Sequence, residues 1–302
     1  MPLRHDMRRG VLCMLAACAL FTAMGGVVKA LGGRIPFPEL MFFRSLFALP
    51  VVLALVLRNA RGGVAGALRT RRFKAHLSRA STGTMAMGCS FYALTVLPLA
   101  EQTALTNATP LFVTLLSIPF LGERVGIHRT SAVLVGFLGI VVIALGQGAF
   151  QGDFAGAARW GVVAAVMHGV FSAATTLLVR SLSGTEASTT IVLWQSLLMT
   201  GFTACALPFV WVTPSFADFL LLVLIGLVGG VAQVLLTEAW ASAQVSALAP
   251  YSYSSILWAI LFGWAAFGDV PSGWTLAGAA LIVVASLYIL HRELVRARRG
   301  RE

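Results

Sequence analysis

Apolar residues occur along this chain in runs of about 20, separated by short polar stretches. As a helix, a run of this length crosses the roughly 30 Å of hydrocarbon in a lipid bilayer. The connections are short, as between helices that pack antiparallel, except at 58–80, where we expect a short amphipathic surface helix. The pattern predicts ten membrane-spanning helices, at 11–31, 37–57, 77–97, 101–121, 128–146, 160–180, 187–209, 216–240, 244–266 and 272–290.

Composition agrees with membrane insertion. Of the 302 residues, 58% are hydrophobic and 11% are charged, whereas a soluble domain has roughly a quarter of its residues charged. So few charges cannot cover a surface in water, and we predict an all-α polytopic membrane protein. No disulfide framework and no metal site are expected, because no CxxC spacing occurs and the cysteines all lie inside apolar runs: Cys13, Cys18, Cys89 and Cys205.

Lysine and arginine predict the orientation, because cytoplasmic loops of membrane proteins are enriched in both. With a cytoplasmic N-terminus, 18 of the 22 lie on the cytoplasmic side and only Arg34 and Arg159 on the other, while Lys29 and Arg44 fall within the membrane. We therefore expect a multi-pass protein of the bacterial inner membrane with both termini in the cytoplasm. The net charge of +11 then reflects topology and contact with anionic lipid, and no nucleic-acid partner is expected.

The two halves of the chain resemble each other. Shifted by 151 residues, GVLCMLAACALFTAMGGVVKALGG (10–33) aligns with GVVAAVMHGVFSAATTLLVRSLSG (161–184), and Arg44 aligns with Gln195. Two matches follow in the same order, QTAL (102–105) with VSAL (245–248) and LGERV (121–125) with FGDVP (267–271). The opening segment has the basic start and the LAAC motif of a cleaved signal peptide, but its internal counterpart indicates a retained helix.

Each half contains five predicted spans, so the second half enters the membrane from the opposite side. We therefore predict two inverted five-helix repeats, an architecture typical of secondary transporters, with a site near the midplane at the repeat interface. The predicted organisation is a cytoplasmic tail at 1–10, repeat 1 at 11–146, a linker at 147–158, repeat 2 at 159–290 and a basic cytoplasmic tail at 291–302.

Three stretches resemble the EamA family of the drug/metabolite transporter superfamily: PELMFFRSLFAL in span 2, TALTNATPLFVTLLSIPFLGERV in span 4, and APYSYSSILWAILFGWAAFGDVPSGWTLAGAALIVVASLYILHRE in spans 9 and 10. A helix ending in Gly-acidic occurs in both halves, at Gly122-Glu123 and Gly268-Asp269, with Asp where Glu is commoner. The resemblance implies a ten-helix plasma-membrane carrier, usually an exporter and sometimes an importer. The family's cargoes include amino acids, nucleoside-like cofactors, riboflavin, acylcarnitines and metallophores, so it does not name the cargo.

Several polar residues fall inside the predicted spans, where a charge is costly and therefore a candidate for function. Arg44 is expected to bind an anionic group of the substrate; the alternative is a structural Arg tied to carbonyl groups or to Glu101. Lys29 is a further substrate-binding candidate that could equally extend to the lipid headgroups. Gln195, aligned with Arg44, is either a substrate ligand or a contact between helices.

Two residues are candidates for proton coupling. His168 lies near the midplane of span 6, where it either titrates or is hydrogen-bonded between helices. Glu238 lies near the inner end of span 8 and is the first candidate for a proton-carrying carboxylate. The remaining substrate-binding candidates are Asn107, Gln233, Tyr251 and Tyr253, and the hinge candidates are Pro110 and Pro250, because proline breaks a backbone hydrogen bond within a helix.

The sequence thus predicts a secondary carrier of a small metabolite, working by alternating access with H⁺ as the driving ion and exporting a cargo that carries carboxylate or other anionic groups. A non-transporting membrane partner subunit is the alternative. An intramembrane enzyme is disfavoured, because there is no HExxH motif and a His168–Ser172 pair is the only serine dyad that the spacing suggests. No ATP-binding signature occurs and no cofactor is expected.

Overall fold

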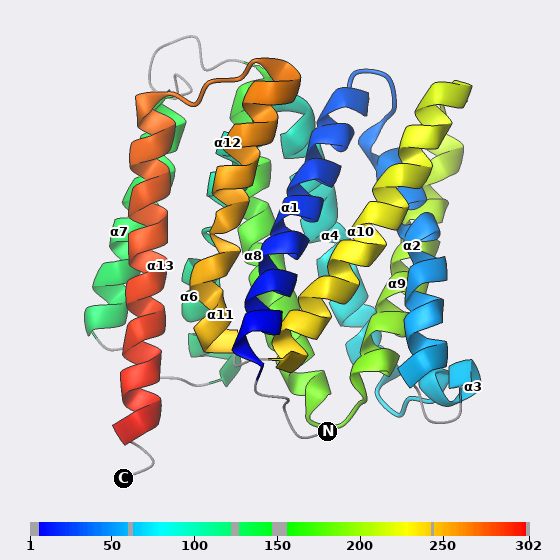
Figure 1. The fold of residues 1–302 in the computed structure, drawn as a ribbon, viewed down its shortest axis with the longest axis horizontal. Helices are drawn as coiled ribbons and strands as arrows, with labels where there is room; N and C mark the ends of the chain where they lie inside the picture. Colours follow the sequence, from blue (N-terminus) through cyan, green and yellow to red (C-terminus); the bar gives the residue numbers. More distant parts are fainter. Residues whose placement is uncertain (1–5, 60–62, 122–126, 147–155, 243–244, 300–302) are drawn as a thin grey trace.

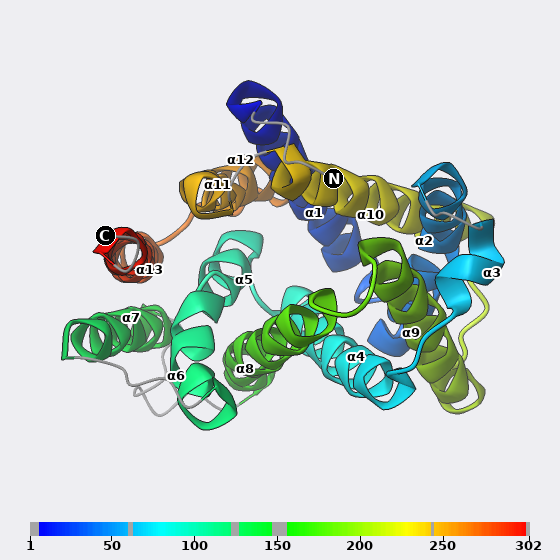
Figure 2. The ribbon, with the colours of Figure 1, turned by 90° about the horizontal axis from the view of Figure 1, so that it is seen from below.

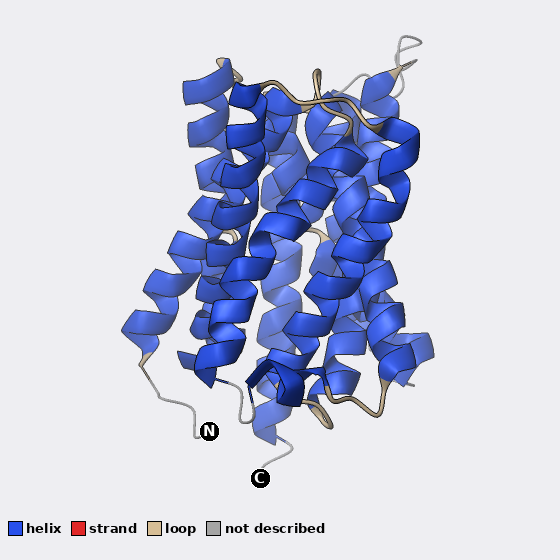
Figure 3. Cartoon of the chain, turned by 90° about the vertical axis from the view of Figure 1, so that its right-hand side faces the viewer, coloured by secondary structure: helices blue, strands red, loops and turns tan. Residues whose placement is uncertain are grey.

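The computed structural model describes residues 6–59, 63–121, 127–146, 156–242 and 245–299, which form α-helices and no β-strand (Figures 1 and 3). The Gly122-Glu123 pair and most of the predicted linker 147–158 lie outside these residues. The helices are α1 (Met7–Leu31), α2 (Phe37–Asn59), α3 (Gly63–Leu68), α4 (Phe73–Val96), α5 (Leu99–Thr106), α6 (Thr109–Leu121), α7 (Ile127–Gly146), α8 (Ala157–Ser183), α9 (Ser188–Val210), α10 (Phe216–Ser242), α11 (Val245–Ser252), α12 (Ser254–Phe267) and α13 (Gly273–Arg299).

Seven helical segments in the described part of the chain are long and apolar enough to cross a membrane, and α7 supplies a shorter apolar helix, Thr130–Gly146. Many large apolar side chains on the outside of the bundle are exposed, among them Leu138 on α7, Phe209 on α9 and Leu257 on α12. So much exposed apolar surface is unfavourable in water and is suited to lipid. The protein is therefore an all-helical, multi-pass membrane protein, as the sequence predicted.

The first turn of α1 and the last turn of α13 lie at the same end of the bundle (Figure 1). We call this the N/C end and the opposite end the far end. From the N/C end, α1 rises to the far end at Leu31, and α2 returns. The short helix α3 lies beside the N/C end of α2 and α9, within the segment where the sequence predicted a surface helix.

Five helix pairs form the framework of the bundle: α7 with α13, α4 with α8, α1 with α10, α2 with α10, and α2 with α9. In addition, α12 packs on α1, and α6 packs on α8 (Figure 2). At the crossing of α7 and α13 the backbones touch, since a Cβ added at Gly139 would lie 2.7 Å from the carbonyl oxygen of Gly278. Helices approach this closely only where a glycine faces the partner.

Two predicted spans are interrupted, which corrects the continuous helices expected at 101–121 and 244–266. The first breaks at Asn107 and Ala108, between α5 and α6, and the second at Tyr253, between α11 and α12. Pro110 is the second residue of α6, where its missing N–H costs little, because the first turn of a helix leaves N–H groups unpaired. The hydroxyl of Thr109 donates to the carbonyl oxygen of Thr106 (2.7 Å), across the break.

Candidate functional site

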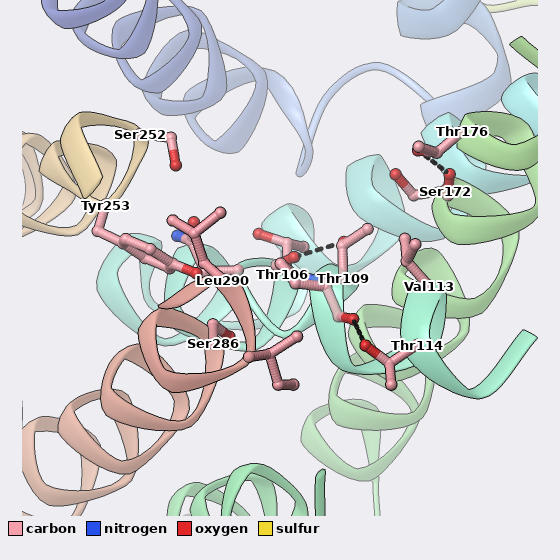
Figure 4. A pocket seen from close by; sticks show the side chains of 13 residues that line it. Thr106, Thr109, Val113, Thr114, Ser172, Thr176, Ser252, Tyr253, Ser286 and Leu290 are labelled. Carbon is pink, nitrogen blue, oxygen red and sulfur yellow. Dashed lines mark hydrogen bonds between the residues drawn. The ribbon is translucent and has the colours of Figure 1, made fainter. Parts of the chain in front are cut away.

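A cavity of about 420 Å³ lies where the two interrupted spans face each other (Figure 4). We call it the hydroxyl cavity, because nine of its lining side chains carry a hydroxyl or an amide. Its volume is within the range of small-molecule sites in proteins. The lining consists of Thr106, Asn107, Thr109, Pro110, Val113, Thr114, Ser172, Thr176, Ser252, Tyr253, Ser286, Ile289 and Leu290.

Both helix breaks contribute polar side chains to this cavity. Asn107, at the end of α5, donates from Nδ2 to the carbonyl oxygen of Thr103 (2.8 Å) and to the hydroxyl of Ser255 (3.0 Å), which ties the first break to the start of α12. Tyr253, at the second break, extends toward α13, which carries Ser286 (Figure 4). The breaks thus direct side chains into the space between the helices.

The hydroxyl cavity lies in the half of the bundle nearer the N/C end. Ser286 lies at the middle of α13 and Leu290 one turn closer to that end, and Ser172 and Thr176 belong to the half of α8 that leads to the same end. None of the thirteen described lining residues is charged, so hydrogen bonds and apolar contacts are what this cavity offers a ligand.

A second, smaller pocket of about 20 Å³ lies between α2, α9 and α10, and we call it the arginine pocket. It brings together three residues that the sequence singled out, Arg44, Gln195 and Gln233. The Gln195 amide donates to the sulfur of Met199 (3.4 Å), and the Nε of Arg44 is buried without a hydrogen-bond partner. The remaining lining residues are Ser45, Ala48, Val52, Val192, Ser196, Met199, Gly229 and Gly230.

The sequence model of the EamA-like transporter family matches this chain twice, over residues 8–145 and over residues 159–291. The chain belongs to the EamA-like transporter family. Together the two matches cover almost all of the helical bundle.

Relatives of this family member carry transporter names. A riboflavin transporter of Rhizobium johnstonii is 31% identical over 297 residues, covering 96% of this chain and 93% of the relative. A pseudopaline exporter of Pseudomonas aeruginosa is 30% identical over 285 residues, covering 93% and 95%. An S-adenosylmethionine uptake transporter of Rickettsia bellii is 26% identical over 265 residues, covering 88% and 87%. A solved crystal structure has the same fold, with a TM-score of 0.65 and 22% identity over 97% of this chain and 99% of the other.

Three charged or titratable residues predicted as sites lie apart from both cavity linings in this EamA-family chain. Lys29 forms an ion pair with Asp269 at the far end, and its ammonium group lies 4.7 Å from the ring centre of Phe267. Glu238 pairs with Arg9 at the N/C end (2.7 Å). His168 contacts the carbonyl oxygen of Ala86 through Nδ1 (2.9 Å) and so links α8 to α4.

The other predicted residues divide between the hydroxyl cavity and the outside of the bundle. Asn107, Pro110 and Tyr253 line the cavity, whereas Tyr251 and Pro250, both on α11, are exposed. Ser172 lines the cavity, and no hydrogen bond joins it to His168 in the described residues, although both lie on α8.

Sequence reasoning missed the small hydroxyl side chains of the cavity and the acidic partners of the ion pairs. Threonine and serine are frequent throughout the chain, and only the rotation of each helix decides which of them face inward. A partial signal existed in the Thr106-x-x-Thr109 spacing next to Pro110, since hydroxyl groups commonly satisfy the carbonyl groups that a proline leaves free.

Proposed function

We propose that this chain is a secondary carrier that exports a small metabolite across the bacterial inner membrane by alternating access, with the hydroxyl cavity as its cargo site. The observation that carries the proposal is the cavity itself, at the two helix interruptions. Discontinuous helices are the usual builders of cargo sites in secondary transporters, because their free backbone groups and end residues face the ligand. The transporter names of the relatives support the same function.

We further propose that the bundle consists of ten spans in two inverted five-helix repeats, with α5–α6 and α11–α12 each acting as one span and α4 and α7 completing repeat 1. In this division α1 and α8 are equivalent helices of the two repeats, and so are α4 and α10. The contact of α1 with α10 then has its counterpart in the contact of α8 with α4. The contact of α1 with α12 likewise becomes that of α8 with α6. The double match of the family model supports the same division.

The orientation proposed from the basic residues makes the N/C end cytoplasmic, with both termini on that side. The hydroxyl cavity then lies in the cytoplasmic half of the membrane. An exporter must receive its cargo from this side, so the position of the cavity is consistent with export.

The lining favours a cargo whose bound portion is neutral and rich in hydrogen-bonding atoms. The threonine hydroxyls of the lining donate to backbone carbonyl groups, and both N–H groups of the Asn107 amide are donated to Thr103 and Ser255. These side chains therefore offer the cargo acceptor oxygens, and Tyr253 adds an aromatic face. The anionic cargo group that the sequence suggested has no cationic partner among the described lining residues, so we assign any such group to a part of the cargo outside this cavity.

Proton coupling is proposed at Glu238. Its ion pair with Arg9 joins α10 to α1 at the N/C end, where the two side chains are 42% and 48% exposed. The proton that drives export moves inward, so Glu238 is proposed as the group that releases it to the cytoplasm. The attraction to Arg9 is lost while the carboxylate carries the proton and returns when the proton leaves. His168, which contacts a backbone carbonyl group of α4, is proposed as a link between α4 and α8.

The test is transport by the purified protein in proteoliposomes, with riboflavin and S-adenosylmethionine as first probes and an imposed pH gradient as the driving force. We expect Tyr253→Phe and Asn107→Ala to slow transport of the active probe about tenfold, because each removes a hydrogen bond to the cargo. Tyr288→Phe is the matched control, because the Tyr288 hydroxyl contacts His128 (3.2 Å) outside the cavity. We expect loss of this hydroxyl to leave the transport rate unchanged.

Two results would overturn the proposal. The carrier function fails if no metabolite from a broad panel, including a cytoplasmic extract, exchanges across the vesicles. The cavity assignment fails if Tyr253→Phe and Asn107→Ala transport at the rate of the Tyr288→Phe control. If the transport rate does not depend on the pH gradient, only the proposed proton coupling is rejected, and the carrier function stands.

A further inference from the structure

The arginine pocket contains a positive charge, that of Arg44, for which the hydroxyl cavity and its cargo provide no partner. Arg44 lies within a membrane-spanning helix, and no carboxylate forms an ion pair with it among the described residues. Its Nε is buried and has no hydrogen-bond partner. A guanidinium group in such surroundings is strongly unfavourable unless a negative charge or several acceptors accompany it.

The side chains around Arg44 are suited to an anion. Ser45, which is 2% exposed, has a buried hydroxyl without a partner and lines the same pocket. Gln195 and Gln233 each bring an amide that can turn its N–H groups inward, and Ser196 adds a second hydroxyl. Among the described residues, the lining contains no acidic side chain, so the pocket combines one positive charge with several hydrogen-bond donors.

The size and the walls of the pocket limit what can occupy it. Its volume of about 20 Å³ exceeds what a single water-sized particle needs, roughly 10–15 Å³, and is far below that of a metabolite. Two glycines of α10 leave room for Arg44 and α2: a Cβ at Gly229 would lie 3.3 Å from the Arg44 Nε, and one at Gly230 would lie 3.0 Å from the Cβ of Val51.

We propose that the arginine pocket binds one small monovalent anion, such as chloride, between Arg44, Ser45, Gln195 and Gln233. The anion supplies the negative charge that Arg44, with its Nε buried and unpartnered, lacks, and it accepts hydrogen bonds from the hydroxyl and the amides. It also joins α2, α9 and α10, which carry these four residues. The site is separate from the hydroxyl cavity, since the two linings share no residue.

The test is thermal unfolding of the purified full-length protein at constant ionic strength, with chloride or bromide replacing gluconate and no cargo present. A ligand that binds only the folded state raises the unfolding temperature in proportion to the logarithm of its concentration above Kd. We expect a rise on the order of 3 °C in either halide at about ten times Kd, growing further with the logarithm of the concentration, and none in gluconate. Because no transport is measured, the result does not depend on the proposed carrier function.

Variants assign the effect to the pocket. Arg44→Gln should abolish the halide-dependent rise, whereas Arg58→Gln, on the same helix but exposed near its end, should retain it. Ser45→Ala and Gln233→Leu keep the charge and should weaken halide binding about tenfold, which tests the site even if Arg44→Gln does not fold. The proposal is overturned if all variants keep the wild-type halide response, if gluconate stabilises equally, or if acetate stabilises and the halides do not, since the pocket would then recognise a carboxylate.

Discussion

The crossing of α7 and α13 offers the sharpest test of the packing, because Gly139 and Gly278 face each other there. An added Cβ at Gly139 would lie 2.7 Å from the Gly278 carbonyl oxygen, and one at Gly278 would lie 2.5 Å from the Gly139 carbonyl oxygen. Both obstructing atoms belong to the backbone, so no side-chain rotation can relieve the contact. The helices must separate, and the contacts of Ile143 and Ile282 beside the crossing are weakened with them.

The perturbation is Gly139→Ala, and the matched control is Gly201→Ala in α9, where no atom lies within 4 Å of the added Cβ. Both substitutions gain the higher helix propensity of alanine, so this gain cancels when the two variants are compared. What remains is the cost of overpacking, about 1–3 kcal/mol. At about 2–4 °C per kcal/mol, Gly139→Ala should unfold about 2–12 °C below the control.

The assay is the unfolding temperature of each purified variant in one detergent. Gly278→Ala should lower it by a similar amount, and the double variant by less than the sum, since one separation of the helices relieves both clashes. Equal unfolding temperatures for Gly139→Ala and Gly201→Ala would refute the reasoning, because the backbones would then not be in contact at this crossing.

Three further predictions concern the ion pairs and His168. Lys29→Met or Asp269→Asn should speed opening at the far end, measured as faster modification of a cysteine introduced at Ala100, and the exchanged pair Lys29→Asp/Asp269→Lys should restore the wild-type rate. Glu238→Gln should change stability by less than about 1 kcal/mol, since its ion pair is exposed, yet abolish the response of transport to a pH gradient. His168→Leu should lower the free energy of unfolding by about 1 kcal/mol, because it removes the contact with the Ala86 carbonyl oxygen. His168→Asn retains a donor near that oxygen and should keep both the stability and the pH profile of transport. Loss of the pH profile in both variants would instead make His168 a proton carrier.

The sequence predicted the helical, multi-pass architecture because membrane insertion leaves a strong one-dimensional signal. Runs such as those of α1, α2 and α10 are apolar over their whole length, whichever neighbours they acquire. The interruptions were harder to locate. Pro110 and Pro250 drew attention to the correct spans, but the chain breaks at Asn107 and Tyr253, three residues away from each proline, where hydroxyl groups and tertiary contacts take over the backbone hydrogen bonds.

The candidate sites were predictable where the depth of a residue in the membrane alone decides which residues meet. Arg44, Gln195 and Gln233 meet because they lie at similar depth on three helices that pack together. Partners set by helix packing were not predictable: Lys29 finds Asp269 at a separation of 240 residues because α12 packs on α1. The ion pair of Glu238 with Arg9 could not be predicted either, because the two residues lie near opposite ends of the sequence. Glu238 therefore looked like a carboxylate with no structural role.

The distribution of contacts between the two ends bears on how such a carrier would move. At the far end, Lys29 with Asp269 links α1 to the segment that connects α12 and α13, and Thr275 with Glu101 (3.0 Å) links α5 to the start of α13. The Lys29–Asp269 pair is partly exposed to water and is worth at most about 1 kcal/mol. The Thr275–Glu101 hydrogen bond is buried and involves a carboxyl group, so it is worth about 1.5–3 kcal/mol. Together they are comparable to the few kcal/mol that separate the conformations of a two-state protein, so a conformational change can break them. The α7–α13 crossing is different, because its backbones touch and cannot slide past each other without a clash. We therefore expect α1, α10 and the interrupted spans to move while α7 and α13 remain paired; the hydroxyl cavity is lined by both the interrupted spans and α13.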